Sequence, residues 1–102
     1  MKPLRTHPPE PALLILISLA AGEKHGHAIM RDVEAFSDIR MGPGSLYGAL
    51  ERLEREGLIE PIPSDDRRRP YRLSEQGRDW LGGQMTALDE LVSVGRERLV
   101  EA

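Results

Sequence analysis

One segment constrains this fold more than any other part of the chain. It is a stripe of leucines that ends at a glycine and is followed directly by an apolar stretch flanked by prolines. The stripe consists of Leu46, Leu50 and Leu53. Steps of four and three are the spacing of one buried helix face, so they predict a helix over residues 45–56. Ser45 is expected to cap its start, and Gly57 to end it in a left-handed conformation. Leu58 would then fold back onto the last turn.

The residues that follow this helix change from a helical to an extended pattern. Prolines at positions 61 and 63 suit a short edge strand within residues 58–62 and forbid a central strand. Tyr71 and Leu73 alternate with Pro70 and Arg72, which predicts the returning strand, with Tyr71 turned to the core. A two-stranded hairpin with a polar, arginine-rich turn is therefore expected.

Two helices are predicted before the stripe. Residues 12–21 are apolar nearly all round, so they should form the buried central helix of a small domain, ending at Gly22. Residues 26–36 form the second helix. The side chains expected on its buried face are Ile29, Val33 and Phe36. Residues 1–10 contain three prolines and are predicted to be a flexible arm.

A long C-terminal helix is expected from Ser74, which can act as its N-cap. Its apolar side chains follow coiled-coil-like steps. A helix this long has little of its own domain to pack against, so the stripe is predicted to meet a second copy of the chain. The residues predicted to form the dimer interface are Leu81, Met85, Leu88, Val92 and Leu99.

These elements together predict a mainly α fold with a small β-hairpin. With 102 residues, the chain has room for one small domain. The order of elements is that of a winged helix-turn-helix over residues 11–73, followed by a dimerisation helix over residues 74–102.

In such a fold the third helix enters the major groove of DNA with its N-terminal turn nearest the bases. Hydroxyl groups, free backbone N–H groups and the planar guanidinium fork of arginine all suit phosphates and base edges. The residues predicted to bind DNA are Gly44, Ser45, Tyr47, Gly48, Arg52, Arg67, Arg68, Arg69 and Arg72. The alternative at two of these positions is structural: Ser45 only caps the helix, and Arg52 only pairs with Glu56.

Charge leaves two functions open. The net charge is −3, which opposes nucleic-acid binding, but five arginines lie within residues 67–78 against one acid. An uneven distribution of this kind can leave a basic edge on an acidic body. The alternative function is a winged-helix module that binds a protein and never contacts DNA. Asp65 and Asp66, at the hairpin turn, favour this alternative.

Other classes of function find little support in the residues. The chain has no cysteine, and His25 and His27 lack a third ligand in register, so no metal and no cofactor are expected. No catalytic constellation is visible, so we expect no enzyme. The longest apolar stretch, residues 12–21, is too short to cross a bilayer, and no secretory signal precedes it. A cytoplasmic location is expected.

Three segments resemble the PadR family of transcription regulators. They are residues 25–29 (HGHAI), residues 44–59 (GSLYGALERLEREGLI) and residues 71–78 (YRLSEQGR), in that order along the chain. The resemblance implies a homodimeric repressor that binds a palindromic operator and is released by a small-molecule effector. A single C-terminal helix resembles the short subgroup of the family. His27 departs from the family pattern, which usually has tyrosine there, and the wing lacks the common glycine-arginine pair.

Overall fold

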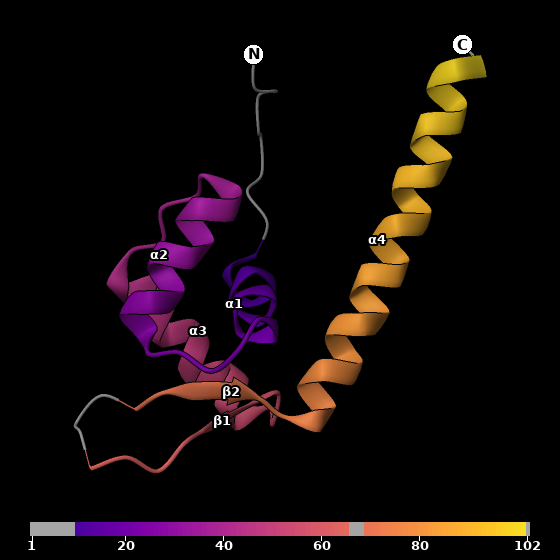
Figure 1. Ribbon diagram of the computed structural model, residues 1–102. Helices are drawn as coiled ribbons and strands as arrows, with labels where there is room; N and C mark the ends of the chain where they lie inside the picture. The colour runs from indigo at the N-terminus through magenta and orange to yellow at the C-terminus, as the bar shows by residue number, and fades with distance from the viewer. Residues whose placement is uncertain (1–9, 66–68, 102) are drawn as a thin grey trace.

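The computed structural model describes residues 10–65 and 69–101. It confirms the predicted fold class and order of elements (Figure 1). The elements are α1 (Pro11–Ala20), α2 (Gly26–Ser37), α3 (Pro43–Arg55), β1 (Ile59–Pro61), β2 (Tyr71–Leu73) and α4 (Glu75–Glu101). The arm predicted for residues 1–10 lies, apart from Glu10, outside the described residues.

Helix α1 is the centre of the core, as its apolar composition predicts. It lies against α2, α3, β2 and the start of α4. Ile15 and Leu16 are completely buried, and the leucine stripe of α3 packs in the same cluster with Ile29 and Val33 of α2. Because the helix is apolar on almost every side, it can pack against neighbouring elements on almost every side.

A polar link joins α1 to α2 beneath this core. The Ser18 hydroxyl, which is 1% exposed, donates to the Asp32 carboxylate at 2.7 Å. Lys24 reaches the same carboxylate, with its Nζ 3.9 Å from Oδ2, and also donates to the Ser18 carbonyl. A buried hydroxyl is stable only when it is hydrogen-bonded, so Asp32 supports the core and does not simply face solvent.

The sheet is larger than the predicted hairpin. Strands β1 and β2 pair antiparallel, with Ile59 opposite Leu73 and Pro61 opposite Tyr71. On its other edge, Tyr71 exchanges two backbone hydrogen bonds, of 3.1 and 2.9 Å, with Lys24. The segment between α1 and α2 thus contributes a one-residue bridge to the sheet. A single bridging residue has no periodic pattern, so the sequence analysis did not predict it.

The start of α3 differs from the prediction. The helix begins at Pro43, and its N-cap is Gly42, in an extended conformation and without a side-chain cap bond. Ser45 is therefore not the cap. The physical reason is that proline is preorganised for the first helical position, where its missing N–H is not needed. The end of the helix is confirmed: Gly57 has a φ of +79°, and the N–H of Leu58 donates to the carbonyl of Leu53 at 3.0 Å.

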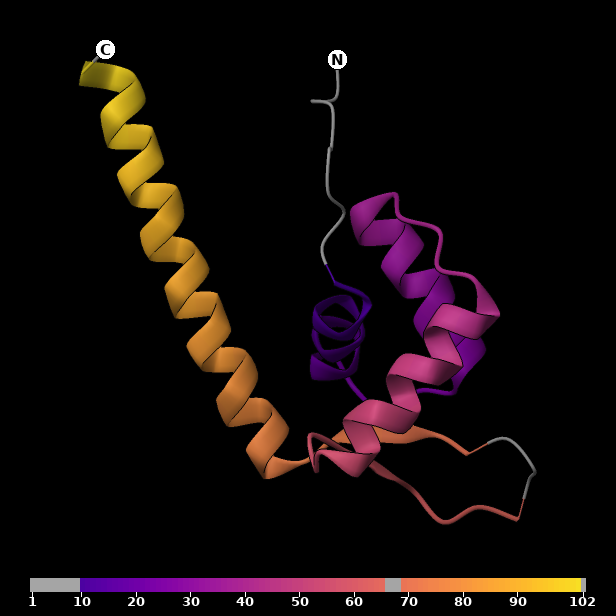
Figure 2. The ribbon, with the colours of Figure 1, turned by 180° about the vertical axis from the view of Figure 1, so that it is seen from behind.

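Phe36 is a second departure. It was expected on the buried face of α2, but it is 45% exposed, whereas Ile29 and Val33 are fully buried. The C-terminal end of α2 extends beyond α1, so α1 does not cover it there (Figures 1 and 2). The helix ends at Ser37, and its C-cap residue Asp38 adopts the left-handed conformation with a φ of +61°.

The start of α4 is locked onto the end of α3 and the hairpin. Ser74 caps α4 as predicted, accepting a hydrogen bond from the N–H of Gly77 at 2.9 Å. Its own hydroxyl donates to the Gly57 carbonyl at 2.6 Å, and its backbone N–H donates to the Leu58 carbonyl at 3.1 Å. These bonds fix the direction in which α4 leaves the domain.

Beyond its first two turns, α4 separates from the body of the molecule (Figures 1 and 2). Leu81 is 7% exposed and belongs to the core of its own subunit, so little of its side chain is available to the predicted dimer interface. From residue 82 to residue 100 every side-chain position is exposed except Gln84, which is half-buried. No helix within residues 10–65 or 69–101 is both long and apolar enough to span a lipid bilayer.

Candidate nucleic-acid interface

The first two turns of α3 present an open surface over a buried support. Gly44, Ser45, Tyr47 and Gly48 are exposed, whereas Leu46 between them is completely buried. The first helical hydrogen bond in this turn runs from the N–H of Leu46 to the carbonyl of Gly42. The N–H groups of Gly44 and Ser45 precede that bond, so they can donate to an anion, and the helix dipole favours negative charge there.

Tyr47 connects this surface to the start of α2. A Cβ placed on Gly26 would lie 3.1 Å from the Tyr47 hydroxyl oxygen and 3.2 Å from its ring carbon Cε1. The ring of Tyr47 therefore leans over the first residue of α2 while remaining 55% exposed. Sequence reasoning did not assign Gly26 a role. It brings the start of α2 and the first turns of α3 into one surface, because its missing side chain lets the ring approach closely.

His25 is the N-cap of α2, which agrees with the helix start predicted at the HxH segment, and His27 is exposed in the first turn. The Nδ1 atom of His25 is buried and has no hydrogen-bond partner among the described residues. Within the same part of the chain, no three His, Cys, Asp or Glu side chains gather closely enough to hold a metal ion.

The hairpin borders α3 through β1, while β2 lies against α1. Tyr71 is half-buried against the core. Burial raises the pKa of its phenol, the negative charge of Glu54 raises it further, and the positive charge of Arg69 opposes them. These influences place β2 and the end of the hairpin turn within electrostatic reach of α3. Arg69 is exposed. Arg67 and Arg68 lie outside the described residues.

The other predicted arginines have different environments. Arg72 lies opposite Glu60 in the hairpin, and its Nε donates to Oε2 at 3.0 Å, so a carboxylate already occupies this guanidinium. Arg52 is exposed and takes part in no ion pair within residues 10–65 and 69–101, so the alternative pairing with Glu56 does not form there. Arg52 is thus available to a ligand, whereas one N–H group of Arg72 already donates to Glu60.

Both views place the N-terminal end of α3, and the described residues on either side of the hairpin turn, on the side of the molecule away from α4 (Figures 1 and 2). The structure thus brings together the predicted residues Gly44, Ser45, Tyr47, Gly48 and Arg52 on one helix, next to the hairpin that carries Arg69. The residues predicted for dimerisation lie elsewhere, on the far part of α4.

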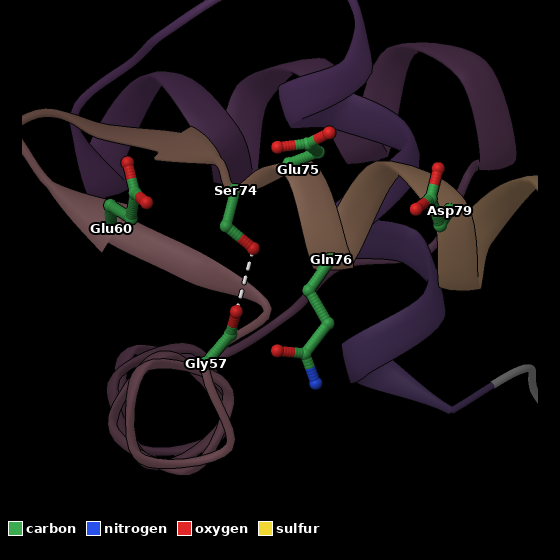
Figure 3. Close-up of a pocket in the computed structure, with 6 residues that line it drawn as sticks. All are labelled: Gly57, Glu60, Ser74, Glu75, Gln76 and Asp79. Carbon is green, nitrogen blue, oxygen red and sulfur yellow. Dashed lines mark hydrogen bonds between the residues drawn. The ribbon is translucent and has the colours of Figure 1, made fainter.

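A pocket at the junction of the hairpin and α4 is unsuited to nucleic acid (Figure 3). Its lining residues are Gly57, Glu60, Ser74, Glu75, Gln76 and Asp79. Three of these are carboxylates, which repel phosphate. The hydrogen bond from Ser74 to Gly57 crosses it, so this pocket belongs to the docking of α4.

The fold and the exposed α3 surface define a winged helix-turn-helix protein with an extended C-terminal helix. The family model described as "Transcriptional regulator PadR-like family" matches residues 15–82. The chain belongs to the PadR family of transcriptional regulators, whose members regulate genes through DNA binding. This confirms the resemblance that the three sequence segments indicated.

Individual relatives agree with this assignment. The chain is 35% identical over 82 residues to transcriptional regulator Rv3488 of Mycobacterium tuberculosis, covering 78% of this chain and 76% of that protein. A PadR family transcription regulator from Clostridium difficile superposes with a TM-score of 0.78 at 26% identity, covering 87% of this chain and 97% of the other.

A further relative is an uncharacterised 37.1 kDa protein in transposon TN4556 of Streptomyces fradiae, 48% identical over 69 residues. The match covers 68% of this chain but only 20% of the transposon protein, so the chain spans about a fifth of that relative's length.

Proposed function

We propose that this protein is a homodimeric repressor that binds a palindromic operator through α3 and the hairpin. The observation that carries the proposal is the open surface of residues 44–48 on a helix whose opposite face is completely buried. A helix held rigidly from behind can insert its free face into a major groove without losing packing.

Two features of this surface suit close approach to DNA. A Cβ added at Gly44 or Gly48 would meet nothing within 4 Å, so the outer side of the first two turns is free of side-chain bulk. Ser45 and Arg52 stand beside this strip, where a hydroxyl and an unpaired guanidinium can reach a phosphate or a base edge. Arg67, Arg68 and Arg69 are proposed to contact the backbone of the flanking DNA.

Dimerisation would place two such surfaces side by side. Exposed apolar side chains continue along α4 beyond the core: Met85, Leu88, Leu91, Val92, Val94 and Leu99. A second apolar strip, Leu13 and Ile17, is only half-buried on α1. A second copy of the chain can cover both, since a monomer rarely leaves this much apolar surface in water. Pairing would set the two recognition helices roughly 34 Å apart, one turn of DNA.

In this proposal residues 11–73 form the DNA-binding domain and residues 74–102 the dimerisation helix. A small-molecule effector would release the operator by binding one arrangement of the two halves better than the other. The repressor acts in the cytoplasm, where its DNA target is found.

Fluorescence anisotropy with a labelled duplex from beside the protein's own gene tests the proposal. We expect the full-length protein to bind, with affinity that falls steeply as salt rises. Arg52→Ala should weaken binding, whereas Arg96→Ala, on the distal part of α4, should not. An absence of binding even at low salt would contradict the proposal and favour a protein-binding winged helix instead.

A further inference from the structure

The outermost line of α3 combines two glycines that the sequence analysis singled out with two charged residues that it did not. At about 100° per residue, four positions lie within roughly 60° of one another and directly opposite the leucine stripe. They are Gly44, Gly48, Glu51 and Arg55. Glu51 is the first of these, counted from the N-terminus, that carries a side chain beyond hydrogen. Its side chain is 77% exposed.

Neighbouring side chains do not cover this position. Tyr47, one turn earlier, leans toward Gly26 and so points to one flank of the helix. The open strip of Gly44 and Gly48 lets the backbone approach a groove floor, which brings the next outward side chain close to the base edges. That side chain is an acid in the middle of a surface that must approach phosphates. A carboxylate there lowers the affinity for DNA of any sequence, unless a hydrogen-bond donor on the DNA pairs with it.

Arg55 does not satisfy this donor requirement. Its Nη1 lies 3.9 Å from the Glu51 carboxylate oxygen, which is within ion-pair range but too long for a hydrogen bond. Both groups are largely exposed, so water screens the contact and it breaks at little cost. The carboxylate therefore keeps its acceptor sites available, while the nearby positive charge reduces its repulsion by phosphate.

We propose that Glu51 is a specificity-determining residue that accepts a hydrogen bond from the amino group of a cytosine in the major groove. An ionised carboxylate is only an acceptor. Guanine and thymine present acceptors there, and adenine presents its donor next to the N7 acceptor. Cytosine alone offers an amino donor with no acceptor beside it on the same base edge. Arg55 acts as a positioning residue for the carboxylate.

This inference rests on the proposed function, and selection from a library of randomised DNA duplexes tests both. The full chain is compared with Glu51→Gln and with Glu56→Gln, which removes the same charge at the C-terminal end of α3. We expect Glu51→Gln to lose about tenfold of the cytosine preference at one position of each half-site. Preference there should move toward adenine, because glutamine can pair with both the amino group and N7. Glu56→Gln should keep the wild-type preference and gain only general affinity.

The outcomes separate the two claims. A wild-type protein that selects no sequence overturns the proposed function and this inference with it. If the wild-type protein selects an operator and Glu51→Gln selects the same bases at every position, the inference alone is overturned. An equal change in Glu51→Gln and Glu56→Gln would show that only net charge matters, and it would also overturn the inference.

Discussion

A Cβ at Gly77 would lie 1.9 Å from the carbonyl oxygen of Leu58, so the first turn of α4 packs directly on the backbone that follows α3. Because the obstacle is backbone, it cannot rotate away. We expect Gly77→Ala to lower the free energy of unfolding by about 3 kcal/mol, the upper end of the usual range for an overpacked site. Urea denaturation followed by circular dichroism measures this.

Gly83 provides the matched control, since a Cβ there meets nothing within 4 Å. Gly83→Ala should leave stability unchanged or raise it by up to about 1 kcal/mol, because alanine is the better helix former. Equal effects of the two substitutions would show that α4 is not docked as described.

Two serines with different surroundings should separate stability from binding. Ser74 is 8% exposed and bonds both Gly57 and Gly77, so Ser74→Ala should cost about 1–2 kcal/mol of stability. Ser45 is exposed and is not a cap, so Ser45→Ala should change stability by less than about 0.5 kcal/mol. Thermal unfolding and DNA titration of both variants check this. Weakened DNA binding is expected from Ser45→Ala, and a strong stability loss from it would contradict the structure.

The raised pKa of Tyr71 predicts that the folded protein loses stability in alkaline solution. Burial and Glu54 raise the pKa of its phenol above the usual 10.0, so the fold favours the protonated form. The corresponding stability is present below about pH 10 and is lost as pH rises through the raised pKa. In Tyr47→Phe, the one remaining tyrosine is Tyr71. Spectrophotometric titration of that variant should show ionisation above pH 10 when folded and near 10 in denaturant. A folded-state pKa at or below 10 would contradict the burial.

The exposed stripe of α4 should control the oligomeric state. Replacing Leu88 and Val92 together with glutamine should shift the protein from dimer to monomer in sedimentation velocity, because apolar area that drives pairing is lost. Glu90→Gln, on the opposite side of the helix, is the control and should leave the dimer intact. A monomeric wild-type protein at micromolar concentration would contradict the proposed pairing.

Local patterns predicted the elements that depend on local physics. The leucines of α3, Gly57 at its end, and Ser74 at the start of α4 all behave as their chemistry requires. Apart from the cap of α3, the departures from the prediction involve tertiary context. Neither the position of Phe36 beyond α1 nor the burial of Leu81 can be read from helical spacing, because both depend on where the core ends.

The candidate site likewise contains features that a local pattern predicts and features that depend on tertiary contacts. Residues 44–48 were located from the helix start alone, although Pro43 and not Ser45 begins the helix. The contact of Tyr47 with Gly26 and the pairing of Arg72 with Glu60 each join segments whose relative orientation no local motif fixes. The outward line that contains Glu51 follows helical spacing, so the sequence could have indicated it.

The central claim is that the outer side of α3 binds DNA, and Gly48→Asp tests it most directly. A Cβ at Gly48 meets nothing within 4 Å, so the fold should tolerate the change, while a carboxylate would face the phosphates. Gly82→Asp, at an equally open helical glycine on α4, is the control. We expect Gly48→Asp to abolish operator binding at unchanged stability, with Gly82→Asp binding normally. Undiminished binding by Gly48→Asp would contradict the account.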